Sequence, residues 1–353
     1  MNMKSSQNGA ESGADRPLLK WLKSGAENDA DLPRPFFVLA PMEDVTDVVF
    51  RSVVARAARP DVFMTEFTNA SSFCSARGEF STRGRLKFLP SEQPIVAQIW
   101  GTKPAEFAQM AHELVERGFA GVDINMGCPD KKVVKSGGGS ALIENPALAI
   151  ELIRAVQKSG ATTSVKTRLG VRNLDEWQPW LTTLLEQNLA NLTVHLRTRK
   201  EMSKVAAHFE LIPEIVKLRD QIAPNTKLTI NGDIRDRTHA MEIWRDNPGV
   251  DGFMIGRGIF ANPFAFEITP RPHNKNELIE LLKFHLDQYD KFREIDTCHS
   301  GLDPESDDKN RYRKFDPLKR FFKIYVRDFD GAKELRDQMM HAKTTDEIRE
   351  IIR

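Results

Sequence analysis

Eight short apolar runs alternate with helix-like segments through the middle of this chain, and this alternation limits its fold more than any other feature. The runs are rich in β-branched and aromatic residues, whereas the intervening segments carry apolar residues at spacings of three and four. Eight repeats over about 230 residues favour a (β/α)8 TIM barrel, because an open doubly wound sheet usually has fewer strands. The expected strands are 36–42, 62–67, 95–101, 121–128, 163–170, 192–198, 227–233 and 252–258.

The pattern changes on both sides of the predicted barrel. Residues 1–32 are rich in Ser, Gly, Asn, Asp and Glu, which predicts a flexible N-terminal tail before a barrel domain at 33–268. After the barrel, long helical patterns without strand-like alternation predict a small all-helical domain at 269–353. Its expected helices are 276–293, 317–328, 331–341 and 345–352, and the polar stretch 294–316 separates the first two.

Composition limits the function only loosely. The formal net charge is +1, so any anionic partner must be held by a local patch of basic residues. Three scattered cysteines are too few for a disulfide framework or a zinc site, and they indicate a reducing compartment. No stretch approaches the ~20 apolar residues of a membrane span. We therefore expect a cytoplasmic monomer that binds neither a membrane nor a metal ion.

Polar residues stand where the predicted strands end. TIM barrels place their chemistry at the C-terminal ends of the strands, so these side chains are expected to face one mouth. The residues are Glu43, Glu66, Asn69, Gln98, Asn125, Cys128, Lys166, Arg168, His195, Arg197, Asn231, Asp233 and Arg257. The mouth is therefore the candidate active site.

Two glycine-containing triplets close the last two predicted strands. Asn231-Gly232-Asp233 ends the seventh strand, and Gly256-Arg257-Gly258 ends the eighth. Glycine lets backbone N–H groups approach an anion, and an arginine offers paired donors to the oxygen atoms of that anion. Either triplet alone could simply turn the chain, but the pair on adjacent late strands predicts a site for a phosphorylated ligand.

Three polar residues on the central strands suit an electron-rich ligand. Lys166 shares one side of its strand with Arg168 and needs an anionic or electron-rich partner if it points into the mouth. His195, which precedes Arg197, is expected to help clamp the ligand. Gln98 can donate and accept hydrogen bonds at once, which suits a flat heterocycle, although the same residue could equally cap a loop.

The segment Asn125-Met126-Gly127-Cys128-Pro129 sets a cysteine at the end of a strand. A basic, glycine-rich loop follows and is expected to act as a mobile lid over an anionic substrate. The thiol could be a nucleophile activated by Lys131 or Lys132, or it could be a proton donor. We favour the proton donor, because a thiol with a pKa near ~8.5 is mostly protonated at neutral pH.

Several motifs follow one another in a fixed order. The most specific is the Asn-x-Gly-Cys-Pro element with Lys132-Val133 and a glycine-rich run after it. The others are Ala40-Pro41-Met42, Val45-Thr46-Asp47, Phe50-Arg51, Gln98-Ile99-Trp100-Gly101, Val165-Lys166-Thr167-Arg168, His195, Arg197-Thr198-Arg199, Asn231-Gly232-Asp233-Ile234 and Ile255-Gly256-Arg257-Gly258. In this order and spacing, over about residues 36–352, the chain resembles the flavin-dependent tRNA-dihydrouridine synthase family.

This resemblance implies FMN as the cofactor, NADPH or NADH as the reductant and tRNA as the substrate. Reduced flavin would pass a hydride to C6 of a uracil turned into the mouth, while Cys128 protonates C5 to give 5,6-dihydrouridine. The residues expected to hold the cofactor are Pro41, Met42, Gln98, Lys166, His195, Asn231, Gly232, Asp233, Gly256 and Arg257. Those expected to contact the substrate are Asn125, Lys132, Arg168, Arg197 and Arg199.

The C-terminal region resembles the RNA-binding domain of that family. Basic residues gather there with aromatic residues between them and a single acidic residue, Asp316, in the same stretch: Arg311, Arg313, Lys314, Lys319, Arg320 and Lys323. A local basic patch with aromatics fits RNA, although a solvated amphipathic helix would show the same pattern. We expect Lys319, Arg320 and Lys323 to contact the RNA.

Two departures from the family pattern lie near the sixth strand. Leu196 stands where the family commonly has glycine, and residues 200–209 lack the usual aromatic and glycine pattern, which concerns the flavin contact near His195 and the choice of uridine. Other functions stay open: a flavin barrel that reduces a free pyrimidine or enone, a synthase acting on another RNA, or an RNA-binding protein that has lost turnover. No short motif encodes which uridine is modified, or in which tRNAs.

Overall fold

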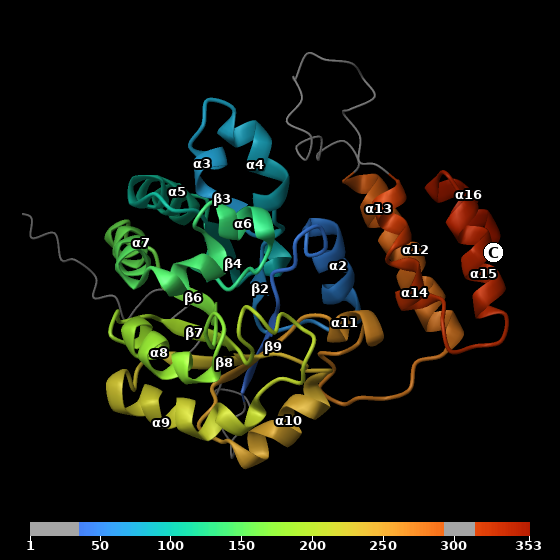
Figure 1. Cartoon of the computed structure of the whole chain (residues 1–353). Coiled ribbons are helices and arrows are strands. Elements are labelled where there is room, and N and C mark those ends of the chain that lie inside the picture. Colours follow the sequence, from blue (N-terminus) through green and yellow to red (C-terminus); the bar gives the residue numbers. More distant parts are fainter. Residues whose placement is uncertain (1–34, 293–314) are drawn as a thin grey trace, which may run out of the picture.

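Eight parallel strands form a barrel in the larger part of the molecule (Figure 1). The computed structural model describes residues 35–292 and 315–353, so the tail predicted at 1–32 and nearly all of the polar stretch 294–316 lie outside the described residues. Neighbouring strands pair in the order β1-β9-β8-β7-β6-β5-β4-β2. A parallel bridge between Val38 and Val62 joins the two ends of this order, which confirms the predicted (β/α)8 barrel.

The strands occupy the predicted positions but end earlier than the sequence suggests. They are β1 Phe36–Leu39, β2 Phe63–Met64, β4 Ile95–Trp100, β5 Gly121–Met126, β6 Thr163–Arg168, β7 Asn191–His195, β8 Lys227–Asn231 and β9 Gly252–Ile255. Residues that follow each strand turn into the loops at its C-terminal end. Several of the predicted site residues therefore lie on loops just beyond the sheet.

The second predicted strand, 62–67, is wrong as one continuous strand. Only β2 lies within this range, and a separate strand, β3 at Thr68–Asn69, follows it; both pair with β4. Between them, the Thr65 hydroxyl accepts a hydrogen bond from the backbone N–H of Gln98 at 3.1 Å, where a continuous strand would offer a backbone carbonyl. The ladder is interrupted there, and Glu66 is left buried at the barrel mouth.

Helices cover the outside of the barrel, and polar caps fix where several of them begin. Asp47, Asn145 and Asp236 each accept a hydrogen bond from the backbone N–H three residues later, which stabilises the first turns of α2, α7 and α10. The helices of the barrel are α2 Val48–Ala57, α3 Ala70–Phe73, α4 Gly78–Leu86, α5 Pro104–Glu116, α6 Lys131–Lys135, α7 Pro146–Lys158, α8 Trp177–Leu185, α9 Ile212–Ile222, α10 Arg237–Asp246 and α11 Gly258–Ala261.

The C-terminal region is helical, as predicted, and lies against one side of the barrel (Figure 1). The prediction of a single helix at 317–328 is wrong, because the chain forms two short helices there. Leu318, Phe321, Phe322, Ile324 and Tyr325 are all buried, which is more than one stripe of a straight helix can bury. The helices are α12 Lys275–Lys291, α13 Asp316–Lys319, α14 Phe322–Tyr325, α15 Ala332–His341 and α16 Thr345–Ile351.

Aromatic side chains join the barrel to the C-terminal helices. The ring of Phe50 on α2 stacks on that of Phe321 with centroids 4.8 Å apart, and Phe260 on α11 and His285 on α12 pack around this pair. His285 Nδ1 lies 2.7 Å from the hydroxyl of Tyr325 in the buried interior. The apolar core is therefore continuous between the two regions. No helix within residues 35–292 and 315–353 has the length and apolar character needed to span a bilayer.

Candidate active site

Polar residues predicted to face the mouth lie side by side across the parallel strands. The register pairs Asn125 on β5 with Lys166 on β6, Arg168 on β6 with His195 on β7, and His195 with Asn231 on β8. Paired residues in a parallel sheet point to the same side, so these groups share one end of the barrel. The structure thus brings together residues that are far apart in the sequence.

A buried hydrogen-bond network connects β4, β5 and β6 at this end. Gln98 Nε2 donates to Asp123 Oδ2 at 2.7 Å, and Ser164 Oγ donates to Asp123 Oδ1 at 2.6 Å. Asn125 Nδ2 donates to Gln98 Oε1 at 2.9 Å. Burial raises the pKa of the Asp123 carboxyl from 3.8 to about 6, although the hydrogen bonds from Ser164 and Gln98 oppose the shift. Gln98 is fully buried and holds its two neighbours, and its predicted flavin contact stays a prediction.

Asn125 also fixes the turn that carries Cys128. Its Oδ1 accepts hydrogen bonds from the backbone N–H groups of Gly127 at 3.1 Å and Cys128 at 2.9 Å. The carbonyl of Cys128 accepts from the Ser140 backbone N–H at 3.0 Å and from Ser140 Oγ at 2.8 Å. A Cβ atom at Gly139, where φ is +57°, would lie 2.8 Å from that carbonyl oxygen, so only glycine permits this approach.

The segment after Cys128 is partly helical, whereas the sequence predicts a flexible loop. It contains α6 and the 3-10 helix η3 (Gly139–Glu144). The side chain of Asp130 caps α6 by accepting hydrogen bonds from the backbone N–H groups of Lys132 and Val133. The side chain of Lys132 is exposed, which fits its predicted contact with an anionic substrate.

The thiol of Cys128 is half-buried beside this turn. Burial raises its pKa above the ordinary 9.0, although a hydrogen bond from the backbone of Asp130 and the nearby charge of Arg168 act in the opposite direction. The thiol is therefore protonated at neutral pH. This state suits a proton donor and does not suit a thiolate nucleophile.

Lys166 reaches the same end of the barrel from β6. Burial, reinforced by the nearby Arg168 guanidinium, lowers the pKa of its ammonium from 10.5 to about 8, while Asp123 partly opposes this shift. Among the described residues no acceptor makes a hydrogen bond or ion pair with Lys166. An ammonium in this position offers its donors to a ligand in the mouth.

Two buried arginines support the loop that follows β7. Arg168 donates to the carbonyl oxygens of Gly127 at 2.7 Å, Thr198 at 3.2 Å and Met202 at 2.9 Å. The second arginine, Arg197, is only 1% exposed and donates from Nε to the Val205 carbonyl at 2.7 Å. Both guanidinium groups are occupied by the protein itself, and the RNA contacts predicted for them stay predictions.

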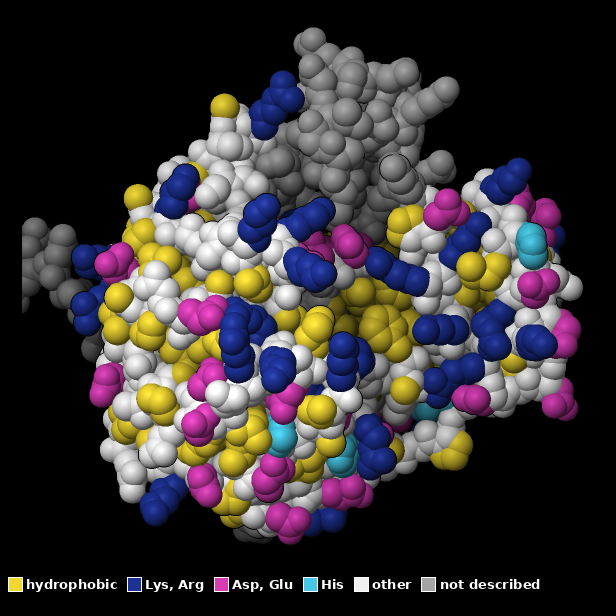
Figure 2. Space-filling model, in the orientation of Figure 1, with side chains coloured by type: hydrophobic (Ala, Val, Ile, Leu, Met, Phe, Trp, Pro, Cys, Tyr) yellow, Lys and Arg dark blue, Asp and Glu magenta, His cyan; other side chains and the backbone are white. Residues whose placement is uncertain are grey.

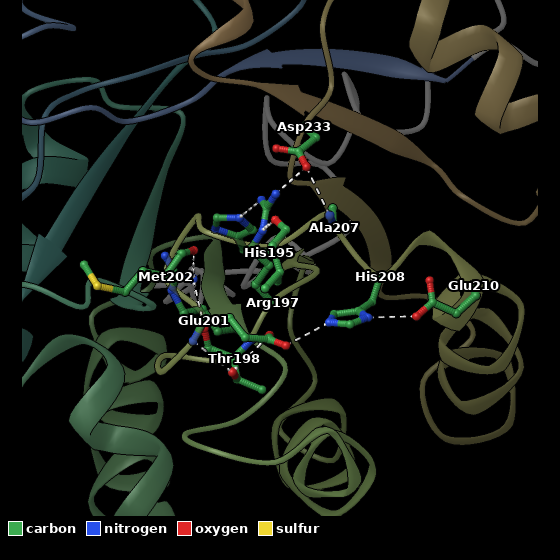
Figure 3. A network of polar contacts seen from close by, with 11 residues as sticks. His195, Arg197, Thr198, Glu201, Met202, Ala207, His208, Glu210 and Asp233 are labelled. Carbon is green, nitrogen blue, oxygen red and sulfur yellow. Dashed lines mark hydrogen bonds and ion pairs between the residues drawn. The ribbon is translucent and has the colours of Figure 1, made fainter.

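Arg197 is the centre of a polar network that also contains two histidines (Figure 3). Its Nη1 lies 3.1 Å from His195 Nε2, and its Nη2 forms an ion pair with Asp233. His208 lies farther along the loop between two carboxylates, with Nε2 3.0 Å from Glu201 and Nδ1 2.8 Å from Glu210. The two histidines therefore face groups of opposite charge.

The predicted phosphate triplets lie on adjacent loops. Gly232 has a φ of +118°, and a Cβ there would lie 3.1 Å from both His195 and Ala207. The carboxylate of Asp233 accepts from the Ala207 backbone N–H at 3.0 Å and lies 3.5 Å from Arg257, whose side chain is 64% exposed. Asn231 donates to the Met254 carbonyl at 2.9 Å, so its side chain ties β8 to β9.

The β1 edge of the mouth holds further glycine and acidic residues. A Cβ at Gly256 would lie 3.7 Å from the sulfur of Met42, next to the half-buried Pro41, so the eighth-strand triplet faces the end of β1.

Glu66 is a buried acidic residue at the same edge of the mouth. Burial, reinforced by Asp47, raises the pKa of Glu66 to about 8. Within residues 35–292 and 315–353, no group of three His, Cys, Asp or Glu side chains is arranged to hold a metal ion.

Basic residues also gather over the C-terminal helices (Figure 2). They border an open hollow of about 730 Å³ together with Phe322, Met340 and two acidic residues. Arg320 and Lys323 are exposed, whereas the half-buried Lys319 is paired with Asp316 at 3.1 Å. The basic lining residues are Lys319, Arg320, Lys323, Lys333 and Arg336. Arg311, Arg313 and Lys314, which the sequence adds to this patch, lie outside the described residues.

Comparison with known proteins identifies the family. The dihydrouridine synthase (Dus) family model matches residues 38–352. The chain belongs to the dihydrouridine synthase family. A probable tRNA-dihydrouridine synthase 2 of Bacillus subtilis (strain 168) is 57% identical over 322 residues, which are 91% of this chain and 94% of that protein. A probable tRNA-dihydrouridine synthase of Staphylococcus aureus (strain COL) is 54% identical over 323 residues, or 92% and 94% of the two chains.

One solved structure shares only a weak likeness with this member of the dihydrouridine synthase family. It is a complex of 2-naphthoyl-CoA reductase with 2-naphthoyl-CoA, with a TM-score of 0.47 and 9% identity over 65% of this chain and 49% of that one. A similarity this low carries no information on function. The family assignment depends on the sequence relatives.

Asp123 and Ser164 belong to the buried hydrogen-bond network at the mouth of this dihydrouridine synthase family member, and sequence reasoning missed them. They lie below the strand ends, so the rule that points to C-terminal positions overlooks them. A signal was present for the first of them: Asp123 interrupts an apolar run and shares its strand face with Asn125, two residues later. The environment of Arg168 and Arg197 had no such signal, because the carbonyls that they bind come from a loop of irregular structure.

Proposed function

We propose that the protein is a flavin-dependent tRNA-dihydrouridine synthase, an oxidoreductase that reduces the C5=C6 bond of specific uridines in tRNA. The names of the two relatives and their length coverage support this activity. The observation that carries it in the structure is the half-buried Cys128, which Asn125 fixes at the same end of the barrel as Lys166 and His195. The same end also carries the glycine triplets.

The residues at the mouth fit a flavin mononucleotide. Lys166 has no protein acceptor among the described residues, and the absence of a side chain at Gly232 lets the His195 ring pack against the backbone of the β8 loop. The exposed Arg257 is available to a phosphate group. When bound, reduced FMN supplies the hydride for C6 of the base, and NADPH or NADH supplies the electrons that renew it. Pro41, Asn231 and Asp233 would shape the cofactor site rather than offer free side-chain donors.

Cys128 would complete the reaction by protonating C5. Its Sγ–H bond breaks as a C5–H bond forms, so the raised pKa that keeps the thiol protonated in the free protein is the required starting state. Asn125 holds the thiol at a constant position by binding the backbone of its turn. The base must leave its stack to reach this position, as in other enzymes that act on single bases.

The surface around the mouth would bind the rest of the tRNA. Lys132 is exposed beside Cys128, while Arg199 is half-buried and paired with Glu144 at 2.6 Å. On the C-terminal helices, Arg320 and Lys323 are exposed at the edge of the hollow, whereas Phe322, which also lines it, is buried. Exposed basic groups of this kind suit contacts with phosphates of the RNA backbone.

The proposed chemistry is tested by Cys128→Ala, with Cys74→Ala as the matched control. Cys74 is also a half-buried free cysteine, but it follows directly after α3 with its sulfur 3.6 Å from the Glu106 carbonyl. We expect Cys128→Ala to bind FMN and tRNA normally and to lose at least about 10²-fold in the rate of uridine reduction, as the removal of a general acid usually does. Cys74→Ala should keep its rate. Equal rates for both variants would exclude Cys128 as the acid.

The substrate is tested by mapping dihydrouridine in RNA from cells that lack the protein. The proposal expects loss of the modification at defined tRNA positions, and it fails if every position in tRNA is retained. Loss from another RNA instead would identify a synthase with a different substrate. Reduction of free uridine but not of tRNA would indicate a small-molecule reductase.

A further inference from the structure

The contact between Arg197 and His195 constrains where the histidine carries its proton. A guanidinium group has only donors, so Nε2 of His195, 3.1 Å from Arg197 Nη1, must be the acceptor. A neutral imidazole has one donor and one acceptor, and its N–H must then be Nδ1. Among the described residues Nδ1 of His195 has no hydrogen-bond partner, and the ring is only half-buried at the mouth.

The charges around His195 also oppose protonation of the ring. Lys166 and Arg168 approach from β6, Arg197 follows on the same chain segment and Arg257 lies beyond β9. Burial and these four cations lower the pKa of His195 well below 6.5. Asp233, an acidic group of the same network, is bound to Arg197 and so balances the charge of the arginine.

His208 in the same network has the opposite environment. Two carboxylates, Glu201 and Glu210, face its two ring nitrogens. Although burial opposes it, these hydrogen bonds raise the pKa of His208 above 6.5. One network thus separates a neutral histidine at the mouth from a more readily charged one farther along the loop (Figure 3).

Arg197 makes the contact with His195 while it is anchored on two other sides. Its Nε binds the Val205 carbonyl at 2.7 Å, and its Nη2 pairs with Asp233 in the phosphate triplet of β8. Asp233 has a left-handed backbone conformation, with φ of 50°, and also binds the Ala207 backbone N–H. The guanidinium is therefore fixed in orientation, and its buried position prevents an exchange of partners with solvent.

We propose that Arg197 is a positioning residue that holds His195 in its neutral tautomer with the proton on Nδ1, so that the ring donates a hydrogen bond to an acceptor atom of the ligand in the mouth. The acceptor would be an oxygen or nitrogen of the flavin, and this part of the inference rests on the proposed function. The tautomer itself does not depend on the flavin. This role for Arg197 is separate from the RNA contact that its sequence position suggests, which stays a prediction.

Nitrogen-15 NMR of histidine-labelled protein without added flavin tests the tautomer directly. We expect the wild-type His195 to show a protonated Nδ1 and an unprotonated Nε2 between about pH 6 and 8, because burial and the neighbouring cations lower its pKa well below 6.5. In Arg197→Met the Nε2 atom loses its donor, so a mixture of tautomers or protonation at the acid end should appear. His208 serves as the control inside each sample and should keep its signals. A wild-type His195 with its proton on Nε2, or signals that do not respond to Arg197→Met, would overturn the proposal.

FMN titration then tests what the tautomer does. Wild-type affinity should be constant between about pH 6 and 8, whereas Arg197→Met should bind about tenfold more weakly near pH 8, the effect of losing one hydrogen bond. Affinity should recover toward pH 6, where protonation restores the N–H on Nδ1. Arg197→Lys keeps a cationic donor and guards against a folding defect, so it should lie between the two. His195→Asn, which places an N–H near the position of Nδ1, should bind better than His195→Ala.

The two measurements separate the possible failures. If the tautomer is as expected but FMN does not bind the wild-type protein, the proposed flavin function fails while the assignment of Arg197 stands. If FMN binds but the Arg197 variants retain wild-type affinity and pH dependence, the positioning role fails while the flavin function stands.

Discussion

Removal of the Asn125 side chain should release the turn that positions Cys128, because the hydrogen bonds that the side chain accepts from that turn are lost. Asn125→Ala leaves the backbone N–H groups of Gly127 and Cys128 and the Oε1 atom of Gln98 without their partner. Each buried polar group that loses its partner costs about 1–3 kcal/mol. Because the Cys128 N–H is only partly buried and can recover a water molecule, we expect the free energy of unfolding to fall by about 3–5 kcal/mol.

The rate of uridine reduction should also fall in Asn125→Ala, even in the fraction of the protein that remains folded. A displacement of a reacting group by about 1 Å can cost about 10²-fold in rate, so we expect a loss of that size in the uridine-reduction step under single-turnover conditions. FMN affinity should change little, because the glycine triplets lie at the ends of β8 and β9, on strands that do not pair with β5. Hydrogen exchange at residues 127 and 128 should become faster.

Asn125→Asp provides the matched comparison. It keeps an oxygen for the two backbone N–H groups but loses the Nδ2 donor, and it turns a carboxylate toward Gln98 Oε1. Slow hydrogen exchange in the turn should therefore persist in Asn125→Asp and be lost in Asn125→Ala. Wild-type turnover together with wild-type urea denaturation in Asn125→Ala would refute the view that this amide positions the acid.

Three further predictions concern other parts of the molecule. The pKa of Asp123 is raised from 3.8 to about 6 in the folded protein, so the folded state binds this proton more tightly than the unfolded chain does. Between about pH 4 and 6 the free energy of unfolding should therefore fall by about 3 kcal/mol as pH rises. Urea denaturation over this pH range should show that Asp123→Asn lacks this fall. Charge reversal at Arg320 and Lys323 should reduce the steepness of the plot of log tRNA affinity against log salt concentration by up to about 2. The control Lys343→Glu lies outside the hollow and should leave this slope unchanged. Equal slopes in all variants would show that the patch is not part of the binding surface. Phe50→Ala should cost about 3–5 kcal/mol and speed hydrogen exchange in α12 before the barrel strands, and unchanged exchange there would show that its stacking on the C-terminal helices is not what holds them.

The barrel could be predicted from the sequence because its signal is repeated eight times. Each repeat combines a short β-branched run with a helical pattern, and the error at any one strand does not affect the number of repeats. The break at Thr65 was not predictable, since it depends on a hydroxyl group taking the place of a carbonyl next to Gln98. The single helix predicted at 317–328 failed for a related reason: whether both faces of a short segment are buried is decided by what packs around it, here the aromatic residues of α2 and α12.

The candidate site was predictable as a set of positions but not as a set of contacts. Strand ends identify Asn125, Lys166 and His195 without any knowledge of their neighbours. Their partners come from the register between strands, which pairs Gln98 with Asp123 and Arg168 with His195 and has no trace in a single sequence.

Burial divides the basic residues of the mouth into two groups that look alike in the sequence. Lys132 and Arg257 are exposed and carry their charge where a polyanion can reach it, whereas Arg168 and Arg197 are enclosed and bind carbonyl and carboxylate oxygens of the protein. The enclosed pair still acts electrostatically at the mouth, because both arginines help to lower the pKa of His195 and Arg168 helps to lower that of Lys166. A buried charge can thus influence which of its neighbours carry protons, and this is why the number of basic residues near the mouth says less about RNA binding than their exposure does.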